Sequence, residues 1–350
     1  MTSPRSFRVK ALLVALFLFA NAVYLARNAH SKFSFFKKLD LSAGNSTLGF
    51  ESILVVSPKI IPPGLRWRKD GLLKAAAYTG IDMEVPQQPA WTTKDTWQLM
   101  SKNPDLKKGY ALSILGHLNA LKIAATRTTS LIVEDDVDWD VGLRSQMPRI
   151  AEAVRNLTGY SAPLHDNGST AQAYPPYGME WDVLWLGHCG ESIVFDPTPV
   201  TLDDPTVPPY YNSWEKIISP DPHHTRYIHQ SAGPICTYAY VVTKATALKI
   251  LNREDAGTNA YDIWLHIMCK GRELRCISVN PELFHHHELA GEKITLINGH
   301  MGESVENEMT DNIWHSARCN SVSKSDKLVT CMGPEPKIEE PILEGLKPDE

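Results

Sequence analysis

The residues best able to do chemistry lie in the segment SLIVEDDVDWD, residues 130–140. Mainly apolar residues there run directly into five carboxylates, which are Glu134, Asp135, Asp136, Asp138 and Asp140. Carboxylates this close repel one another unless a positive group lies among them. Mn²⁺ and Mg²⁺ prefer oxygen ligands and often keep substrate phosphates as further ligands. The segment predicts a metal site at the end of a buried strand, with a solvated acidic turn as the alternative.

A second candidate cluster is the histidine-rich segment PELFHHHE, residues 281–288. Histidine is a frequent ligand for Mn²⁺ and Zn²⁺. If one histidine, taken here as His286, completes the site begun by Glu134 and Asp136, one ion explains both clusters. The alternative is a polar loop that binds no metal.

The elements that must position these clusters alternate between strand and helix. Short apolar runs predict strands at 52–57, 82–86, 130–133, 181–187, 237–243 and 274–279. Helical spacing predicts helices at 65–80, 109–126, 244–252 and 261–271. This order predicts an α/β fold with a mainly parallel central sheet. Ligand sites in such sheets collect at the carboxyl ends of the strands, where the acidic segment lies.

The amino-terminal region has the composition of a targeting segment. Residues 1–38 hold seven basic residues and no acid, which leaves 28 basic against 40 acidic residues in the remainder. We expect a cytoplasmic tail at 1–10 and, at 11–26, either a signal anchor of a type II membrane protein or a cleaved signal peptide. A stem (27–50), one globular domain (51–333) and a disordered acidic tail (334–350) follow. The acidic body argues against a nucleic-acid partner.

Two further patterns agree with the lumen of the secretory pathway, in the ER or Golgi, or with secretion if the signal is cleaved. N-x-S/T sequons occur at Asn45, Asn156 and Asn167. The six cysteines could form up to three disulfides, with Cys269–Cys276 and Cys319–Cys331 as the local expectations.

Several blocks in order carry a family resemblance. GYALSILGHLNALKIA and SLIVEDDVDWD are followed by WDVLWLG, TYAYVVTKATALKIL, AYDIWLHIMCKGRELRCISVNPELFHHHE and DNIWHSARCN. Together they resemble the family 25 glycosyltransferases, the lipooligosaccharide-galactosyltransferase-like group, in their fungal form. The resemblance covers about residues 52–320. It implies a GT-A (Rossmann-like) fold that binds Mn²⁺ and a UDP-sugar and transfers a hexose, commonly galactose, with inversion to a glycan or glycoprotein.

The resemblance also implies roles for particular residues. Asp136 is expected to bind the metal with Glu134 as its partner, while Asp135 completes the acidic motif. Gly187 lies in the second block, and His117 lies near donor or acceptor, although Gly116 stands where the family usually has serine. The basic element that helps hold the nucleotide is represented, at altered spacing, by Arg66 and Arg68.

Inversion requires a general base that takes the proton of the acceptor hydroxyl. The candidates are Asp182, Asp262 and Asp138, and the sequence does not choose among them. The alternative for Asp262 is the N-cap of the predicted helix that follows it, and for Asp182 it is the start of a strand. Tyr238 and Tyr240 alternate along a predicted strand, so we expect them to share a sheet face, where they could stack on a base or sugar. For at least one of them, packing in the core is the favoured alternative. The competing functions are a catalytically silent relative that binds a glycan or partner, and a metal-dependent phosphoesterase.

Overall fold

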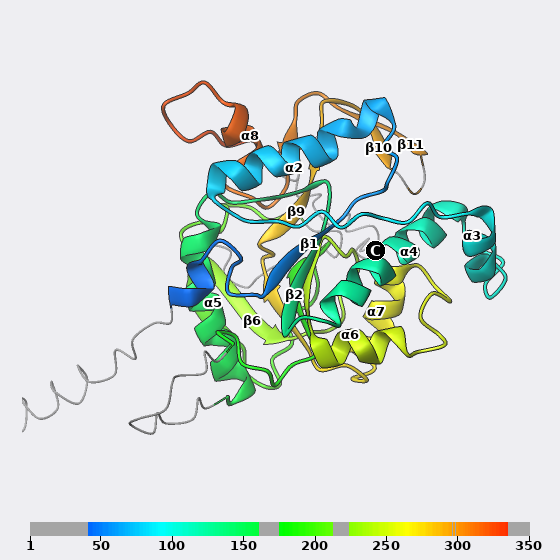
Figure 1. Ribbon diagram of the computed structural model, residues 1–350. Coiled ribbons are helices and arrows are strands. Elements are labelled where there is room, and N and C mark those ends of the chain that lie inside the picture. The colour runs from blue at the N-terminus through cyan, green and yellow to red at the C-terminus, as the bar shows by residue number, and fades with distance from the viewer. Residues whose placement is uncertain (1–40, 161–174, 213–223, 296, 298, 335–350) are drawn as a thin grey trace, which may run out of the picture. The chain divides into compact units, whose positions relative to one another are not determined.

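The computed structural model describes residues 41–160, 175–212, 224–295, 297 and 299–334 (Figure 1). The expected tail and signal segment, most of the stem, Asn167 and the acidic tail after residue 334 lie outside these residues. Asn45 and Asn156, the other two sequon asparagines, are exposed. Within the described part of the chain, no helix is long and apolar enough to cross a membrane.

A seven-stranded mixed sheet forms the centre of the described unit, in the order β1-β2-β7-β4-β8-β6-β5. Its strands are Ser52–Val56, Thr129–Glu134, Ala239–Thr243, Val183–Gly187, Cys276–Asn280, Thr225–Gln230 and Val200–Asp203, in that order. Five strands run in one direction, and β7 and β6 run in the other. The predicted α/β class is confirmed, and the sheet is mixed because the reversed β7 separates β2 from β4.

Helices cover both faces of this sheet (Figure 1). One face packs against α4 (Lys108–Ala124), α6 (Lys244–Leu251) and α7 (Tyr261–Lys270), with α3 (Thr93–Met100) against α4. The other face packs against α2 (Arg66–Thr79) and α5 (Leu143–Thr158). Alternation along the strands divides the core, since Leu54 and Ile132 point to the first layer and Ile53 and Val133 to the second.

Smaller elements extend the fold beyond the carboxyl end of β2. Strand β3 (Val137–Trp139) pairs with β9 (Phe284–Glu288), which pairs with β12 (Met309–Thr310). Strands β10 (Gly291–Thr295) and β11 (Gly299–Val305) form a two-stranded sheet. Helix α8 (Ala317–Val322) lies against α2. Short 3-10 turns occupy Leu41–Gly44 and Pro63–Leu65.

Most predicted elements are present, but several were missed or misjudged. Helix α2 ends where Gly80 was expected to stop it, with Gly80 at φ 65°. The histidine segment, whose alternative reading was a polar loop, is strand β9. Helix α5 and strands β5 and β6 were not predicted. The strand expected at 82–86 is reduced to one bridge between Leu54 and Glu84.

All six cysteines are paired in disulfides. The expected pairs Cys269–Cys276 and Cys319–Cys331 are confirmed. The third bridge, Cys189–Cys236, joins the chain after β4 to the chain before β7.

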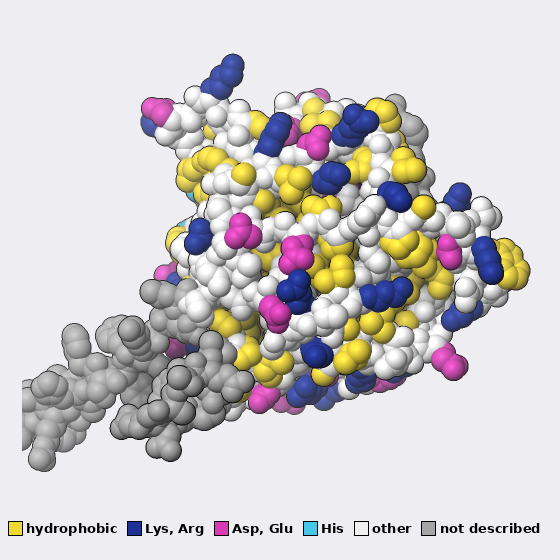
Figure 2. Space-filling view, in the orientation of Figure 1, with side chains coloured by type: hydrophobic (Ala, Val, Ile, Leu, Met, Phe, Trp, Pro, Cys, Tyr) yellow, Lys and Arg dark blue, Asp and Glu magenta, His cyan; other side chains and the backbone are white. Residues whose placement is uncertain are grey.

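On the face of the molecule seen in Figure 2, Lys and Arg side chains are scattered between hydrophobic and acidic ones rather than gathered in a stripe. Trp97 of α3 is a large hydrophobic side chain that is 66 % exposed.

The expected stem does not extend to residue 50. Ala43, Leu48 and Phe50 are buried in the core, and the Phe50 ring stacks on Tyr177 with centroids 4.5 Å apart. These residues bury apolar surface that a flexible stem would leave in water. The folded unit therefore includes residues 41–50.

Phe50→Ala is expected to lower the free energy of unfolding by about 3–5 kcal/mol, because it leaves a cavity under a buried aromatic ring. Chemical denaturation would measure the change. Ile60→Ala is the matched control, since Ile60 is 83 % exposed and its loss should change stability by no more than about 0.5 kcal/mol. Equal effects of the two substitutions would contradict the burial of Phe50.

Candidate active site

The acidic turn lies at the carboxyl end of β2, which ends at Glu134, and leads through Asp135 and Asp136 into β3. Two buried arginines place positive charge next to these carboxylates and offset their mutual repulsion. Arg68 Nε lies 2.8 Å from Asp135 Oδ1, and Arg68 Nη1 lies 2.6 Å from Asp136 Oδ2. Arg318 donates to the backbone carbonyls of Asp135 and Val137, at 2.8 and 2.7 Å. The protein thus places fixed cations of its own beside the turn.

Burial and the neighbouring charges shift the pKa values of this group in opposite directions. Burial raises the pKa of Asp135, although Arg68 and a hydrogen bond from Ser57 act against it. Burial also lowers the pKa of Arg318 to about 10, despite the attraction of the neighbouring carboxylates. The acidic turn is therefore held inside the protein and is not a solvated loop.

Asp138 and Asp140 hold the fold together beside this turn. The Asp138 side chain is fully buried and accepts hydrogen bonds from the hydroxyls of Thr310 and Ser316 and from the backbone N–H of Arg318. Asp140 accepts from the backbone N–H groups of Gly142 and His315. A carboxylate whose lone pairs are already used is poorly placed to take a substrate proton. We therefore do not retain Asp138 as a candidate base.

Glu134 faces a polar group on the α4 side of the sheet. Its Oε1 accepts from the Thr237 hydroxyl at 2.9 Å and lies 3.7 Å from His117 Nε2. The buried His117 ring stacks on Tyr261 at 4.5 Å, and its Nδ1 lies 3.1 Å from the Tyr240 hydroxyl. Burial alone would raise the pKa of Glu134, but His117 and Thr237 outweigh it and lower that pKa. Glu134 is thus held as a carboxylate by fixed neighbours.

Asp262, in the first turn of α7, lies on the same side. Its carboxylate accepts from the backbone N–H groups of Cys236 at 3.2 Å and Ile263 at 2.9 Å. Burial raises the pKa of Asp262, and the charge of Glu134 adds to that rise. Cys236 directly precedes Thr237, which binds Glu134. Asp262 therefore belongs to the edge of the sheet that carries the acidic turn.

Asp182 lies at the opposite edge. It directly precedes β4, which runs in the same direction as β2, so it is at the amino end of its strand. Its carboxylate pairs with Arg275 Nη2 at 3.0 Å and accepts from the Arg275 backbone N–H at 2.8 Å. The structure does not bring Asp182 to the acidic turn.

Other residues expected at the donor site divide in the same way. Tyr240 is fully buried in the core under α4 and α7, whereas Tyr238 precedes β7 and its ring lies 5.1 Å from His285 and from His286. The prediction that the two tyrosines share a sheet face is therefore wrong. A Cβ at Gly187 would lie 2.7 Å from the Phe284 carbonyl oxygen, so close strand packing alone requires that glycine.

The two arginines predicted for nucleotide binding have different positions. Arg66 begins α2 and is exposed, whereas Arg68 is buried in its ion pairs with the acidic turn. On a helix, residues two positions apart point about 200° away from each other. Arg68 is therefore the arginine that belongs to the site.

His286 lies next to the acidic turn because β9 pairs with β3, with His286 opposite Val137. Its Nε2 donates to Glu288 at 2.9 Å. Among the described residues, its buried Nδ1 has no hydrogen-bond partner, and neither has the buried Oδ1 of Asp136. Burial lowers the pKa of His286, but the bond to Glu288 and the charge of Asp136 outweigh it and raise that pKa. Two buried polar atoms are thus left for a further ligand.

The neighbouring His285 is used within the protein. Its Nδ1 lies 2.6 Å from Glu282 Oε1, and Glu282 also accepts from the Tyr211 hydroxyl and the Asn312 amide. Burial would raise the pKa of Glu282, but the bond with His285 and the nearby charges of His285 and His188 outweigh it and lower that pKa to about 2.

This lowered pKa predicts an acid-labile contribution to stability. Glu282 stabilises the fold above its ordinary pKa of 4.5, and the stabilisation is lost as pH falls from there through about 2. Glu282→Gln should lower the free energy of unfolding by about 1–3 kcal/mol at neutral pH and flatten its fall in acid. Denaturation at a series of pH values measures both effects. The exposed Glu254→Gln is the control, and an unchanged acid profile in Glu282→Gln would oppose this assignment.

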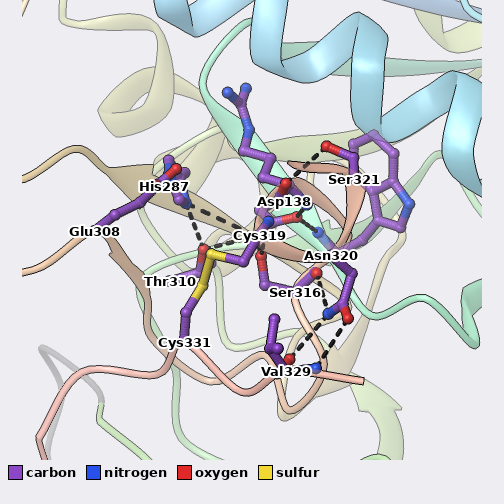
Figure 3. Close-up of a disulfide and its surroundings, with 12 residues drawn as sticks. Asp138, His287, Glu308, Thr310, Ser316, Cys319, Asn320, Ser321, Val329 and Cys331 are labelled. Carbon is purple, nitrogen blue, oxygen red and sulfur yellow. Dashed lines mark hydrogen bonds and ion pairs between the residues drawn. A yellow bond between two sulfur atoms is a disulfide. The ribbon is translucent and has the colours of Figure 1, made fainter. Parts of the chain in front are cut away.

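The predicted ligand trio of Glu134, Asp136 and His286 is not assembled around one point. In the described part of the chain, the group of three ligand atoms that all lie within 4.8 Å of one another is His287, Glu308 and Cys319. Figure 3 shows that Cys319 is bonded to Cys331, so its sulfur is not a thiolate. Glu134 is bonded to Thr237 and faces His117 of α4, whereas Asp136 pairs with Arg68 of α2, a helix that packs against the other face of the sheet.

Three further contributors to the site were not predicted, and only two of them, Ser57 and Thr237, had a signal in the sequence. Ser57 follows the carboxyl end of β1 and donates to Asp135 at 2.8 Å, as the rule for strand ends would suggest. Thr237 precedes the reversed β7 and so reaches the same edge. Arg318 comes from a segment 183 residues beyond Asp135, and no local pattern announced it.

Comparison with known proteins adds little to this geometry. No protein-family model matches the chain, and no curated protein matches it. Among solved structures, the chain is similar to one titled "Crystal Structure of A197 from STIV", at 10 % sequence identity and a TM-score of 0.33. The match covers 75 % of this chain and 97 % of that one. A likeness this distant assigns neither fold nor function.

Proposed function

We propose that the protein is an inverting glycosyltransferase with a GT-A type of fold. It would transfer a hexose, with galactose as the first candidate, from a UDP-sugar to a glycan or glycoprotein acceptor. The proposal joins the ordered sequence blocks to the site at the carboxyl end of β2. We also propose that the protein resides in the lumen of the ER or Golgi, with residues 11–26 as a membrane anchor or cleaved signal.

The observation that carries the proposal is the pair of unpartnered buried atoms, Asp136 Oδ1 and His286 Nδ1. With Nε2 donating to Glu288, neutral His286 presents a lone pair on Nδ1, which is the tautomer that a metal ligand requires. Asp136 and His286 therefore fit as ligands for Mn²⁺ or Mg²⁺. The ion would neutralise the diphosphate leaving group. Glu134 is not retained as a ligand, because its carboxylate accepts from the Thr237 hydroxyl and lies beside His117.

The protein's own residues supply the rest of the proposed reaction. Asp262 is the proposed base, because its raised pKa and its place beside Glu134 suit proton transfer at this edge. It would take the proton of the acceptor hydroxyl as that oxygen bonds to C1 of the sugar and the bond from C1 to the diphosphate breaks. Tyr238, His117 and Glu134 line the donor side in this proposal, and Arg68 fixes Asp135.

The test is donor hydrolysis by residues 39–350 with a panel of UDP- and GDP-sugars, with and without Mn²⁺. Slow turnover of one UDP-sugar that depends on Mn²⁺ would support the proposal and identify the sugar. Absence of both turnover and nucleotide binding would overturn it.

One observation favours a second candidate, a silent relative that binds a glycan or partner. Arg68 pairs with both Asp135 and Asp136, so the turn already holds a cation. Binding of UDP-sugars without turnover, with or without an acceptor panel, would favour this candidate.

A further inference from the structure

A second group of possible ligands lies around the Cys319–Cys331 disulfide (Figure 3). It includes His287, which follows His286 in β9 and so points to the opposite face of that strand. His287 Nε2 lies 2.8 Å from Glu308 Oε1, and Cys319 Sγ completes a group within 4.8 Å. His287 and Cys319 are buried, while the Glu308 side chain is 41 % exposed and leaves the group open to solvent.

The hydrogen bonds around His287 leave a place for a cation. The Thr310 hydroxyl donates its one proton to Asp138 Oδ2 at 2.7 Å, so it can only accept from His287 Nδ1, 2.8 Å away. With its proton on Nδ1, neutral His287 directs the lone pair of Nε2 at a carboxylate oxygen of Glu308. Two lone pairs at this distance require a positive species, either a second proton or a metal ion.

We propose that reduction of the Cys319–Cys331 disulfide creates a Zn²⁺ site formed by His287 Nε2, a Glu308 carboxylate oxygen and Cys319 Sγ. These are three of the ligand types that Zn²⁺ takes in proteins, with water as the fourth ligand. The Thr310 hydroxyl and Asp138 behind it fix the histidine tautomer, as in known histidine–metal sites. The site is separate from the one under Proposed function and does not depend on it.

The chemistry needs a dithiol reductant. The dithiol supplies two electrons and two protons, and its own two sulfurs become joined in a disulfide. The bond between Cys319 and Cys331 breaks, and each cysteine becomes a thiol. Zn²⁺ then displaces the thiol proton of Cys319 and any proton on His287 Nε2 to solvent.

The surrounding contacts hold Cys319 in place when the bridge is open. Cys319 lies in α8, and its backbone N–H donates to the Ser316 hydroxyl at 3.0 Å. The side chain of Asn320 binds the backbone N–H and the carbonyl of Val329, both at 2.9 Å. The segment between the two cysteines therefore keeps contacts that do not depend on the disulfide.

The test uses Cys331→Ser in the full-length chain, which frees the Cys319 thiol without a reductant and leaves the other bridges intact. We expect it to bind one more Zn²⁺ per chain than the oxidised wild type, and Co²⁺ to show a thiolate-to-cobalt charge-transfer band. Adding His287→Ala or Cys319→Ser should abolish both signals, and Thr310→Val should weaken binding about 10–100-fold.

Absence of the band and of the extra Zn²⁺ in folded Cys331→Ser would overturn the proposal, as would a band that persists after His287→Ala. If circular dichroism shows that Cys331→Ser is unfolded, dithiol-reduced wild type is compared with equally reduced Cys319→Ser. Equal Zn²⁺ binding by those two proteins would overturn the proposal in the same way.

Discussion

Asp136→Asn is expected to reduce Mn²⁺-dependent sugar transfer by at least about 10²-fold, because a lost metal ligand removes several kcal/mol of leaving-group stabilisation. Asparagine keeps the size of the side chain, and Arg68 keeps its pair with Asp135, so the fold should survive. Steady-state rates against Mn²⁺ concentration, with Mn²⁺ binding on the same samples, measure the effect.

Asp105→Asn is the matched control for this substitution, since Asp105 is an exposed carboxylate outside the site. It should leave rate and Mn²⁺ binding unchanged. An Asp136→Asn protein that transfers sugar at the normal rate would remove Asp136 from the proposed metal site. A normal affinity for Mn²⁺ together with a lost rate would instead move Asp136 from metal binding to substrate binding.

Asp262→Asn is expected to lower kcat about 10²–10⁴-fold with little change in donor binding, which is the pattern of a lost general base. The base acts only when deprotonated, so activity should fall as pH drops through its pKa. Because burial raises the pKa of Asp262, that acid limb should lie above the range of an ordinary carboxyl group. The asparagine variant should lose this limb, as kcat over a pH series would show.

Asp182→Asn is the matched control for Asp262→Asn. Both aspartates were candidate bases, but Asp182 lies at the opposite edge of the sheet in its pair with Arg275. Its substitution should leave kcat and the acid limb nearly unchanged. A larger loss of kcat in Asp182→Asn than in Asp262→Asn would reverse the assignment of the base.

Local patterns predicted what depends on local sequence. The apolar runs before Glu134 and Gly187 predicted buried strands, and Gly80 predicted a helix end. The short spacing of Cys269 and Cys276 predicted their bridge. Each of these features follows from the preferences of a few adjacent residues.

The pairing of charges could not be predicted in this way. Arg68 meets Asp135 across 67 residues, and which arginine of α2 faces the turn depends on how the helix rotates against the sheet. The reversal of β7, which brings Thr237 to Glu134, likewise depends on strand pairing. The sequence supplied the carboxylates, but tertiary packing chose their partners.

The Cys189–Cys236 bridge has a consequence for proteolysis. Its closed loop contains β5 and β6 and spans 47 residues, and both of its ends lie beside Tyr238 and Thr237. A protease that cuts the chain once within this loop would leave two fragments still joined through the bridge. The nicked protein would therefore migrate as one species in electrophoresis until the disulfide is reduced. At the edge of the sheet that carries Glu134, the bridge would still join the chain after β4 to the chain before β7.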